Sequence, residues 1–272
     1  MKKILILGGS GFIGNALYKE LYPYFNTHAT YRTENAFFEQ NQKFHQFDVE
    51  KESISILLES LRPNIIISAL RGNFDAQIYA HFEIIDYILR TRDTKLIFLS
   101  SANVFDAFTN YPSYEYDKTL SQSVYGRFKI KIENALLRLP NHKYVIARVP
   151  MVYGANSPRV LEIKRQLKEV EAIEVFSNVV VNATTDAKLT QQIHYLINQK
   201  KQGVFHLGSN DLIHHNDLIA EICEELGEKD PLLKNVYDSN FDRFLAVLPK
   251  DNLLPKNLQI SVQEVISGTL IT

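Results

Sequence analysis

The chain of 272 residues contains one cysteine, Cys223, and no tryptophan. A single cysteine cannot form an internal disulfide, and it cannot build a metal site made of several cysteines. Such low cysteine usage is typical of a reducing compartment, so we expect a cytoplasmic protein. The eight histidines do not show the paired spacing of metal ligands, and we therefore expect no metal.

An excess of one charge and long apolar runs are also missing. The 30 Lys and Arg residues nearly balance the 31 Asp and Glu residues, which leaves a net charge of −1 and no basic field for nucleic acid. No apolar stretch approaches the length that spans a membrane. The opening MKKILIL resembles the start of a signal peptide, but glycines soon interrupt it, and we interpret it as a strand. We therefore expect neither a nucleic-acid nor a membrane partner.

Glycines are few, but four of the 11 lie in one segment, GGSGFIG, at residues 8–14. An apolar run precedes the segment and an amphipathic helix pattern follows it, which predicts a strand, a tight turn and a helix. We expect Gly8 to take turn dihedrals, Gly11 to let backbone N–H groups approach a pyrophosphate, and Gly14 to let the helix approach the strand. The predicted dinucleotide contacts of this turn are Gly8, Ser10, Gly11, Phe12, Ile13 and Gly14.

Strand and helix patterns alternate through the first half of the chain. The predicted strands are Lys3–Leu7, Thr27–Tyr31, Phe44–Val49, Ile65–Ala69, Lys95–Ser100 and Tyr144–Arg148. The predicted helices are Phe12–Tyr22, Ser53–Leu61, Asp75–Arg92 and Ser121–Leu139. This alternation predicts an α/β protein with a Rossmann-type, doubly wound parallel sheet, whose strands carry the ligand site at their carboxyl ends.

Shorter and less regular segments follow, and they predict a smaller α+β lobe for the substrate. Its predicted elements are Val160–Lys168, Ile173–Phe176, Asp186–Asn198, Val204–Leu207 and Asn216–Leu226. We therefore predict a dinucleotide-binding domain at residues 1–148 and a substrate-binding lobe at residues 149–272. The helix at residues 186–198 is a segment that can pack back on the first domain.

Residues at the ends of the predicted strands extend the cofactor site. Arg32 follows the second strand, where a basic residue suits the 2′-phosphate of NADP and an acidic one suits the ribose of NAD. Arg32 therefore favours NADP(H) over NAD(H), although Glu34 lies nearby and a solvated loop arginine is the simpler alternative. Asp48 is expected either to contact the adenine or to cap the next helix. Val49 and Ala69 complete the predicted contacts at this edge.

Tyr125 and Lys129 form a Tyr-x-x-x-Lys pair within the predicted helix at 121–139. The i, i+4 spacing places both side chains on one face, and a neighbouring ammonium lowers the pKa of a phenol. The pair therefore suits proton transfer by Tyr125, while the Lys129 ammonium can also bind ribose hydroxyls, which makes both residues cofactor contacts as well. Ser101, at the end of the fifth strand, can hydrogen-bond the substrate oxygen. Tyr114 and Lys118 match the same spacing, but they follow a proline in a predicted loop.

Four segments in this order, GGSGFIG, LSSANVF, YGRFK and ARVPMVYG, resemble the extended short-chain dehydrogenases/reductases. Within that family the chain is most similar to the dTDP-4-dehydrorhamnose reductase-like, sugar-nucleotide-binding group. Ser101 takes the place of that group's catalytic threonine, and Tyr125 follows it 24 residues later, as the group's pattern expects. The later segment GVFHLGSNDLIHHNDLIAEICEEL also resembles the group, so the resemblance covers nearly the whole chain.

The resemblance implies an NAD(P)H-dependent reductase of a keto sugar nucleotide, acting as a monomer or homodimer, with Tyr125 as the general acid. Arg71, Asn103 and Arg159 are the candidate substrate contacts. Ala102-Asn103 replaces an Asp-Tyr pair usual in the group, and the loop at 70–73 also departs from its pattern, so the sugar stays open. A sugar-nucleotide epimerase that uses NAD and a non-catalytic NADP-binding regulatory subunit are the alternatives.

Overall fold

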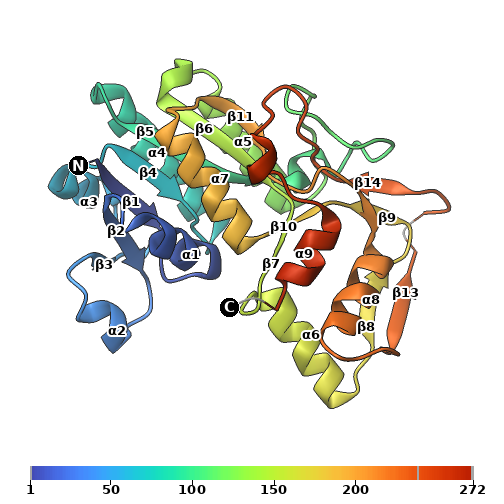
Figure 1. The fold of residues 1–272 in the computed structure, drawn as a ribbon. Coiled ribbons are helices and arrows are strands. Elements are labelled where there is room, and N and C mark those ends of the chain that lie inside the picture. The colour runs from blue at the N-terminus through green and yellow to red at the C-terminus, as the bar shows by residue number, and fades with distance from the viewer. Residues whose placement is uncertain (1, 238, 271–272) are drawn as a thin grey trace. The chain divides into compact units, whose positions relative to one another are not determined.

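The structure is a computed structural model that describes residues 2–237 and 239–270 (Figure 1). Its contacts divide the chain into two compact units. The first unit comprises Met1–Ser100, Val124–Ala147 and Ile193–Val204, and the second comprises Ser101–Ser123, Arg148–Gln192 and Phe205–Thr272. The chain thus passes between the units at several points, one of which lies between Ala147 and Arg148. The second half of the helix expected at 186–198 groups with the first unit.

The main sheet has seven strands in the order β11-β6-β5-β4-β1-β2-β3. The strands are β1 (Lys3–Leu7), β2 (Asn26–Tyr31), β3 (Phe44–Gln46), β4 (Ile65–Ser68), β5 (Lys95–Ser101), β6 (Tyr144–Val149) and β11 (Gly203–His206). The pairs from β3 through β5 are parallel. The strand order reverses between β1 and β4, which is the crevice where open α/β sheets bind ligands. The predicted α/β class with a Rossmann-type sheet is confirmed.

Helices cover the sheet because β1 and β4 are apolar on both faces. The helices of the first half are α1 (Phe12–Leu21), α2 (Ala36–Glu39), α3 (Ile54–Leu61), α4 (Phe74–Arg90) and α5 (Val124–Leu136). Leu5 and Leu7 of β1 pack in a core with residues of α3, α4 and α5. At α1, Glu20 meets His194 of α7 (Asp186–Asn198), whose Nδ1 lies 2.7 Å from the Glu20 carboxylate.

Several element boundaries differ from the prediction by one to three residues, and two of these differences have clear local causes. β3 ends at Gln46 rather than Val49, because Asp48 turns the chain by accepting the N–H of Glu50 at 3.0 Å. α5 begins at Val124 rather than Ser121, because the Asp106 carboxylate binds the preceding residues 121–123. Asp48 does not cap α3 either; Ser53 is the cap of that helix.

The described part of the second unit is built from short strands, the first half of α7 and three further α-helices. Its strands are β7 (Met151–Tyr153), β8 (Ile173–Phe176), β9 (Val179–Val181), β10 (Ala183–Thr185), β12 (Ile213–His214), β13 (Leu233–Val236) and β14 (Arg243–Leu245). Its helices α6 (Pro158–Glu169), α8 (His215–Glu225) and α9 (Val262–Gly268) accompany three small sheets, and residues of all three helices share a second apolar core. No helix in the described residues has both the length and the apolar character needed to cross a membrane.

At the amino-terminal edge of the main sheet, two lysines donate hydrogen bonds to the carboxyl ends of helices. Lys3 donates to the carbonyl of Leu61 at the end of α3, and Lys143 donates to the carbonyl of Ile88 near the end of α4 at 2.8 Å. Cations at helix carboxyl ends satisfy unpaired carbonyls and complement the helix dipole. These contacts give the lysines a structural role, and the polar residues considered next lie at the opposite edge.

Candidate active site

The glycine turn between β1 and α1 leaves no room for side chains at two of its positions. Gly8 has φ +80°, and a Cβ there would lie 2.6 Å from the carbonyl oxygen of Ala69. A Cβ on Gly14 would lie 2.1 Å from the carbonyl oxygen of Gly8. The turn, the end of β4 and the first turn of α1 therefore pack backbone against backbone, as the sequence predicts for Gly8 and Gly14.

Gly11 differs because a side chain built at this position would meet only one neighbouring atom of the protein within 4 Å. It has φ −79° as the N-cap of α1, and the nearest atom to a Cβ built there is the carbonyl oxygen of Gly8 at 3.3 Å. No side chain caps α1, so the N–H groups at its start, at Phe12 and Ile13, have no side-chain acceptor at the cap. Thr30 anchors the turn by accepting the N–H of Gly8 with its hydroxyl and the N–H of Ser10 with its carbonyl. An open glycine before an uncapped helix suits a pyrophosphate.

We expect the substitution Gly11→Ala to fold and to weaken dinucleotide binding at least tenfold. The backbone at Gly11 is one that alanine adopts, but the new methyl group would stand where the phosphates approach the turn. Calorimetric titration with NADPH measures the affinity, and thermal unfolding measures the fold. Gly14→Ala is the contrasting control, since its methyl would collide with Gly8 and lower the melting temperature. An unchanged affinity in folded Gly11→Ala would contradict this placement of the phosphates.

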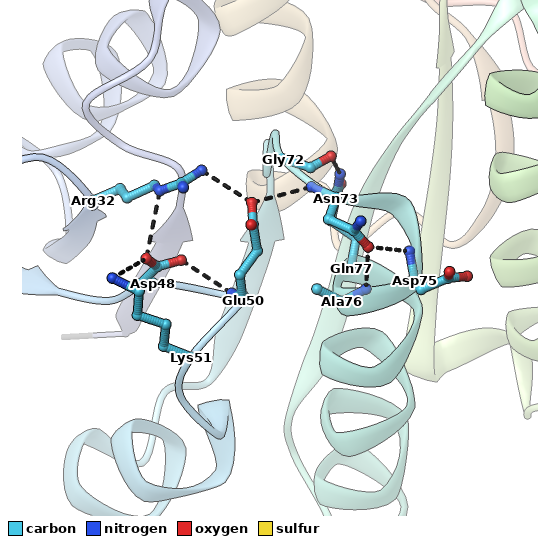
Figure 2. Close-up of polar contacts among 9 residues, drawn as sticks. All are labelled: Arg32, Asp48, Glu50, Lys51, Gly72, Asn73, Asp75, Ala76 and Gln77. Atoms are coloured by element: carbon cyan, nitrogen blue, oxygen red, sulfur yellow. Dashed lines mark hydrogen bonds and ion pairs between the residues drawn. The ribbon is translucent and has the colours of Figure 1, made fainter.

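Three polar residues meet at the carboxyl ends of β2 and β3 (Figure 2). The Arg32 guanidinium lies 3.6 Å from the carboxylate of Asp48 and 3.1 Å from that of Glu50. The sequence prediction singled out Arg32 and Asp48, and the structure brings them together, but the prediction missed Glu50. No sequence motif marks Glu50, because its position depends on how the chain turns after β3.

Val49 and Ala69 lie at the same edge. Val49 is buried, and its side chain lies 3.6 Å from the Cβ position of Gly72 in the loop after β4. Ala69 donates its N–H to the carbonyl of Leu7 at 2.9 Å, which joins the end of β4 to the end of β1. The predicted dinucleotide contacts at Arg32, Asp48, Val49 and Ala69 therefore lie with the glycine turn at the carboxyl ends of β1 to β4.

Tyr125 and Lys129 both lie on α5, one turn apart. The Tyr125 ring is 38% exposed and packs against Phe74, with 5.9 Å between ring centroids. Lys129 is buried, and its ammonium donates to the carbonyl oxygen of Leu99 at 2.9 Å while lying 5.6 Å from the Tyr125 ring centroid. Burial lowers the pKa of Lys129 to about 7, although the nearby Glu133 acts in the opposite direction. The ammonium that accompanies Tyr125 is thus poised to change its charge near neutral pH.

A buried carboxylate that the sequence prediction missed stands one turn beyond Lys129. Glu133 is 1% exposed and accepts a hydrogen bond from the Ser100 hydroxyl at 2.5 Å. The signal was present in the sequence, because Tyr125, Lys129 and Glu133 follow one another at intervals of four residues on one helix face. Glu133 supplies negative charge near a buried ammonium, which favours the charged form of Lys129.

The structure separates the two Tyr-x-x-x-Lys matches. The chain at Tyr114 is not helical, and the Tyr114 N–H donates to the Asp117 carboxylate at 2.7 Å, so no helix face joins Tyr114 to Lys118.

Ser101, in the second unit, is the last residue of β5, and its hydroxyl donates to Asn103 Oδ1 at 3.0 Å. Ser101 and Asn103 are thus bonded to each other.

The two candidate substrate arginines lie on exposed backbone segments. Arg71 is in the loop between β4 and α4, and Arg159 is in the first turn of α6. Both residues are exposed, and within residues 2–237 and 239–270 neither arginine forms an ion pair. Burial raises the pKa of Tyr153 to about 12, which leaves it protonated in the second unit. The described residues also include no cluster of three or more His, Cys, Asp or Glu that would hold a metal ion.

Comparisons with known proteins agree with this fold. A family model described as the RmlD substrate binding domain matches residues 83–254. The dTDP-4-dehydrorhamnose reductase of Yersinia enterocolitica is 21% identical, with a TM-score of 0.79 over 100% of both chains. The enzyme of the same name from Bacillus anthracis, solved in complex with NADP, is 20% identical, with a TM-score of 0.77 over 99% of this chain and 98% of the other. At these identities the structures show the shared fold.

A relative of a different kind is the methionine adenosyltransferase 2 subunit beta of Rattus norvegicus. It is 25% identical over an alignment of 251 residues that covers 87% of this chain and 66% of the relative. The chain thus spans slightly less than two thirds of that subunit's length.

Proposed function

Because the chain belongs to the RmlD substrate binding domain family, we propose that it reduces a keto group of a sugar nucleotide, with a nicotinamide dinucleotide as the reductant. The substrate class is supported by the family and by the names of the two structural neighbours described above, which are dTDP-4-dehydrorhamnose reductases. Arg32 favours NADP(H) as the dinucleotide, and one of these neighbours is named as a complex with NADP.

One observation carries the proposal: the described first unit combines an open phosphate turn with a buried ammonium behind a partly exposed tyrosine. Gly11 and the uncapped start of α1 suit the pyrophosphate. Tyr125 and Lys129 stand on one helix face, with Lys129 fixed by the carbonyl of Leu99. A pure binding protein requires only the first of these features.

A dinucleotide held by the turn at residues 8–14 would supply the hydride for the carbonyl carbon of the sugar in the proposed reaction. The Tyr125 hydroxyl gives its proton to the carbonyl oxygen as negative charge develops there, so a C–H and an O–H bond form while the C=O double bond becomes a C–O single bond. The Lys129 ammonium stabilises the tyrosinate that remains until solvent returns the proton. Ser101 orients the same oxygen in this proposal, which is supported by the sequence resemblance that puts it in the place of a catalytic threonine. Arg71, Asn103 and Arg159 stay the candidate contacts of the nucleotide sugar.

A non-catalytic subunit that binds the dinucleotide is the second candidate. The observation that favours it is the relative named as a subunit beta, which matches 87% of this chain. The pairing of Tyr125 with Lys129 on one helix face argues for turnover, because a protein that only binds the dinucleotide does not need a proton donor.

A spectrophotometric assay at 340 nm distinguishes these candidates. The purified protein is mixed with NADPH, or with NADH, and with dTDP-4-keto-6-deoxy sugars. Consumption of the reduced dinucleotide together with a hydroxy product supports the reductase. Epimerised product without net loss of cofactor would assign an epimerase, and saturable binding without either product would assign the subunit.

A further inference from the structure

Glu50 occupies the position between the predicted 2′-phosphate ligand and the loop before α4. Its Oε1 atom lies 3.1 Å from Nη1 of Arg32 and accepts the backbone N–H of Asn73 at 3.3 Å. Figure 2 shows the carboxylate between these two groups. One oxygen atom therefore links the exit of β2 to the loop that follows β4.

The loop that holds Glu50 is itself well fixed. Asn73 caps α4 by accepting the N–H groups of Asp75 and Ala76 at 2.9 and 3.1 Å. Gln77 donates to the carbonyl of Gly72 at 2.9 Å, and Gly72 has φ +126°. A Cβ at Gly72 would lie 3.1 Å from the Glu50 carboxylate, so glycine leaves room for that carboxylate. The position of the Glu50 carboxylate is therefore fixed by the loop at residues 72–73.

The two carboxylates near Arg32 differ in how firmly they are held. Asp48 is 13% exposed at its side chain, accepts the N–H of Glu50 at 3.0 Å and also lies 3.7 Å from the ammonium of Lys51. The Glu50 side chain is 36% exposed, and the Arg32 side chain is 52% exposed. Solvent and an incoming anion therefore reach the Arg32–Glu50 pair more easily than they reach Asp48.

We propose that Glu50 is a specificity-determining residue that competes with the 2′-phosphate of a dinucleotide for Arg32. The proposal rests on the proposed dinucleotide site and names what sets its preference. A 2′-phosphate must share Arg32 with the Glu50 carboxylate and also experiences that carboxylate's negative charge. A 2′-hydroxyl carries no charge and avoids both effects. Glu50 thus reduces the difference in binding affinity by which Arg32 favours NADP(H) over NAD(H).

The test compares adenosine 2′,5′-bisphosphate with AMP, because the two ligands differ only in the 2′-phosphate. Calorimetry gives both dissociation constants for the wild type, Glu50→Gln, Glu34→Gln and Arg32→Met. We expect Glu50→Gln to bind the bisphosphate about fivefold to tenfold more tightly and AMP within twofold of the wild type. The glutamine amide oxygen can still accept the Asn73 N–H, so the loop is retained. Glu34→Gln, the matched control on the same exit loop, leaves both constants unchanged, and Arg32→Met removes the bisphosphate's advantage.

The outcomes separate this proposal from the proposed function. Binding of both ligands with an unchanged ratio in Glu50→Gln would overturn the role of Glu50 alone. A shift of the ratio in Glu34→Gln, with none in Glu50→Gln, would assign the preference to Glu34 instead. No binding of either ligand to the wild type would overturn the dinucleotide site and this proposal with it.

Discussion

The substitution Tyr125→Phe is expected to lower kcat for keto reduction by roughly a thousandfold, because it removes one hydroxyl and hence the proton donor. The Tyr125 ring packs against Phe74, and phenylalanine keeps that contact, so the fold is expected to be unchanged. Dinucleotide affinity should stay within about threefold of the wild type, since the phosphate turn at residues 8–14 is untouched. Initial rates at 340 nm and calorimetric titration with NADPH measure the two quantities.

The second Tyr-x-x-x-Lys match supplies the control for this experiment. Tyr114→Phe removes the same atom from the same motif, but residue 114 is not helical and has no helix face in common with Lys118. We expect its rate to stay within about threefold of the wild type. If Tyr114→Phe lost the activity while Tyr125→Phe kept it, the proton donor would be in the other motif and the proposed mechanism would fail.

The backbone of this site was predictable because short-range rules determine it. Apolar strands, an amphipathic α1 and the spacing of Gly8, Gly11 and Gly14 indicate the strand, the turn and the helix without any tertiary information. The i, i+4 spacing of Tyr125 and Lys129 also needs only the helix to form. These expectations depend on residues close together in the sequence, and the structure reproduces each of these elements.

The charged surroundings of the site depend on residues that are distant in the sequence. Glu50 meets Arg32 only because β2 and β3 are neighbours and the chain turns at Asp48, where the prediction extended the strand. The pairing of Glu133 with Ser100 requires α5 to lie on β5, which no local pattern specifies. Sequence patterns therefore predicted the candidate reacting side chains, while the charged groups around them became visible only in the assembled sheet.

The substitution Lys129→Met is expected to lower kcat/KM by about a hundredfold at pH 6, because it removes the ammonium that stabilises the tyrosinate. The pKa of Lys129 is about 7, so the wild type loses this charge as the pH rises through 7, and its kcat/KM for reduction should fall over that range. The methionine variant has no group to titrate there and should show a low, flat profile. Lys131→Met, which changes an exposed lysine of the same helix, should keep the wild-type profile.

The same variant should also change how stability depends on pH, which separates a buried charge from a merely positioned side chain. Burial lowers the pKa of Lys129 from 10.5 to about 7 in the folded protein. Below pH 7 both the folded and the unfolded chain hold the proton, and the cost of burying the ammonium is fully present. Between pH 7 and 10.5 the folded protein releases the proton while the unfolded chain keeps it, so wild-type stability rises with pH.

Relative to Lys129→Met, the wild-type free energy of unfolding should therefore increase by up to about 1.4 kcal/mol per pH unit in this range. Urea unfolding of both proteins at pH 7, 8 and 9 measures the difference, and a constant difference would mean that Lys129 keeps its proton throughout.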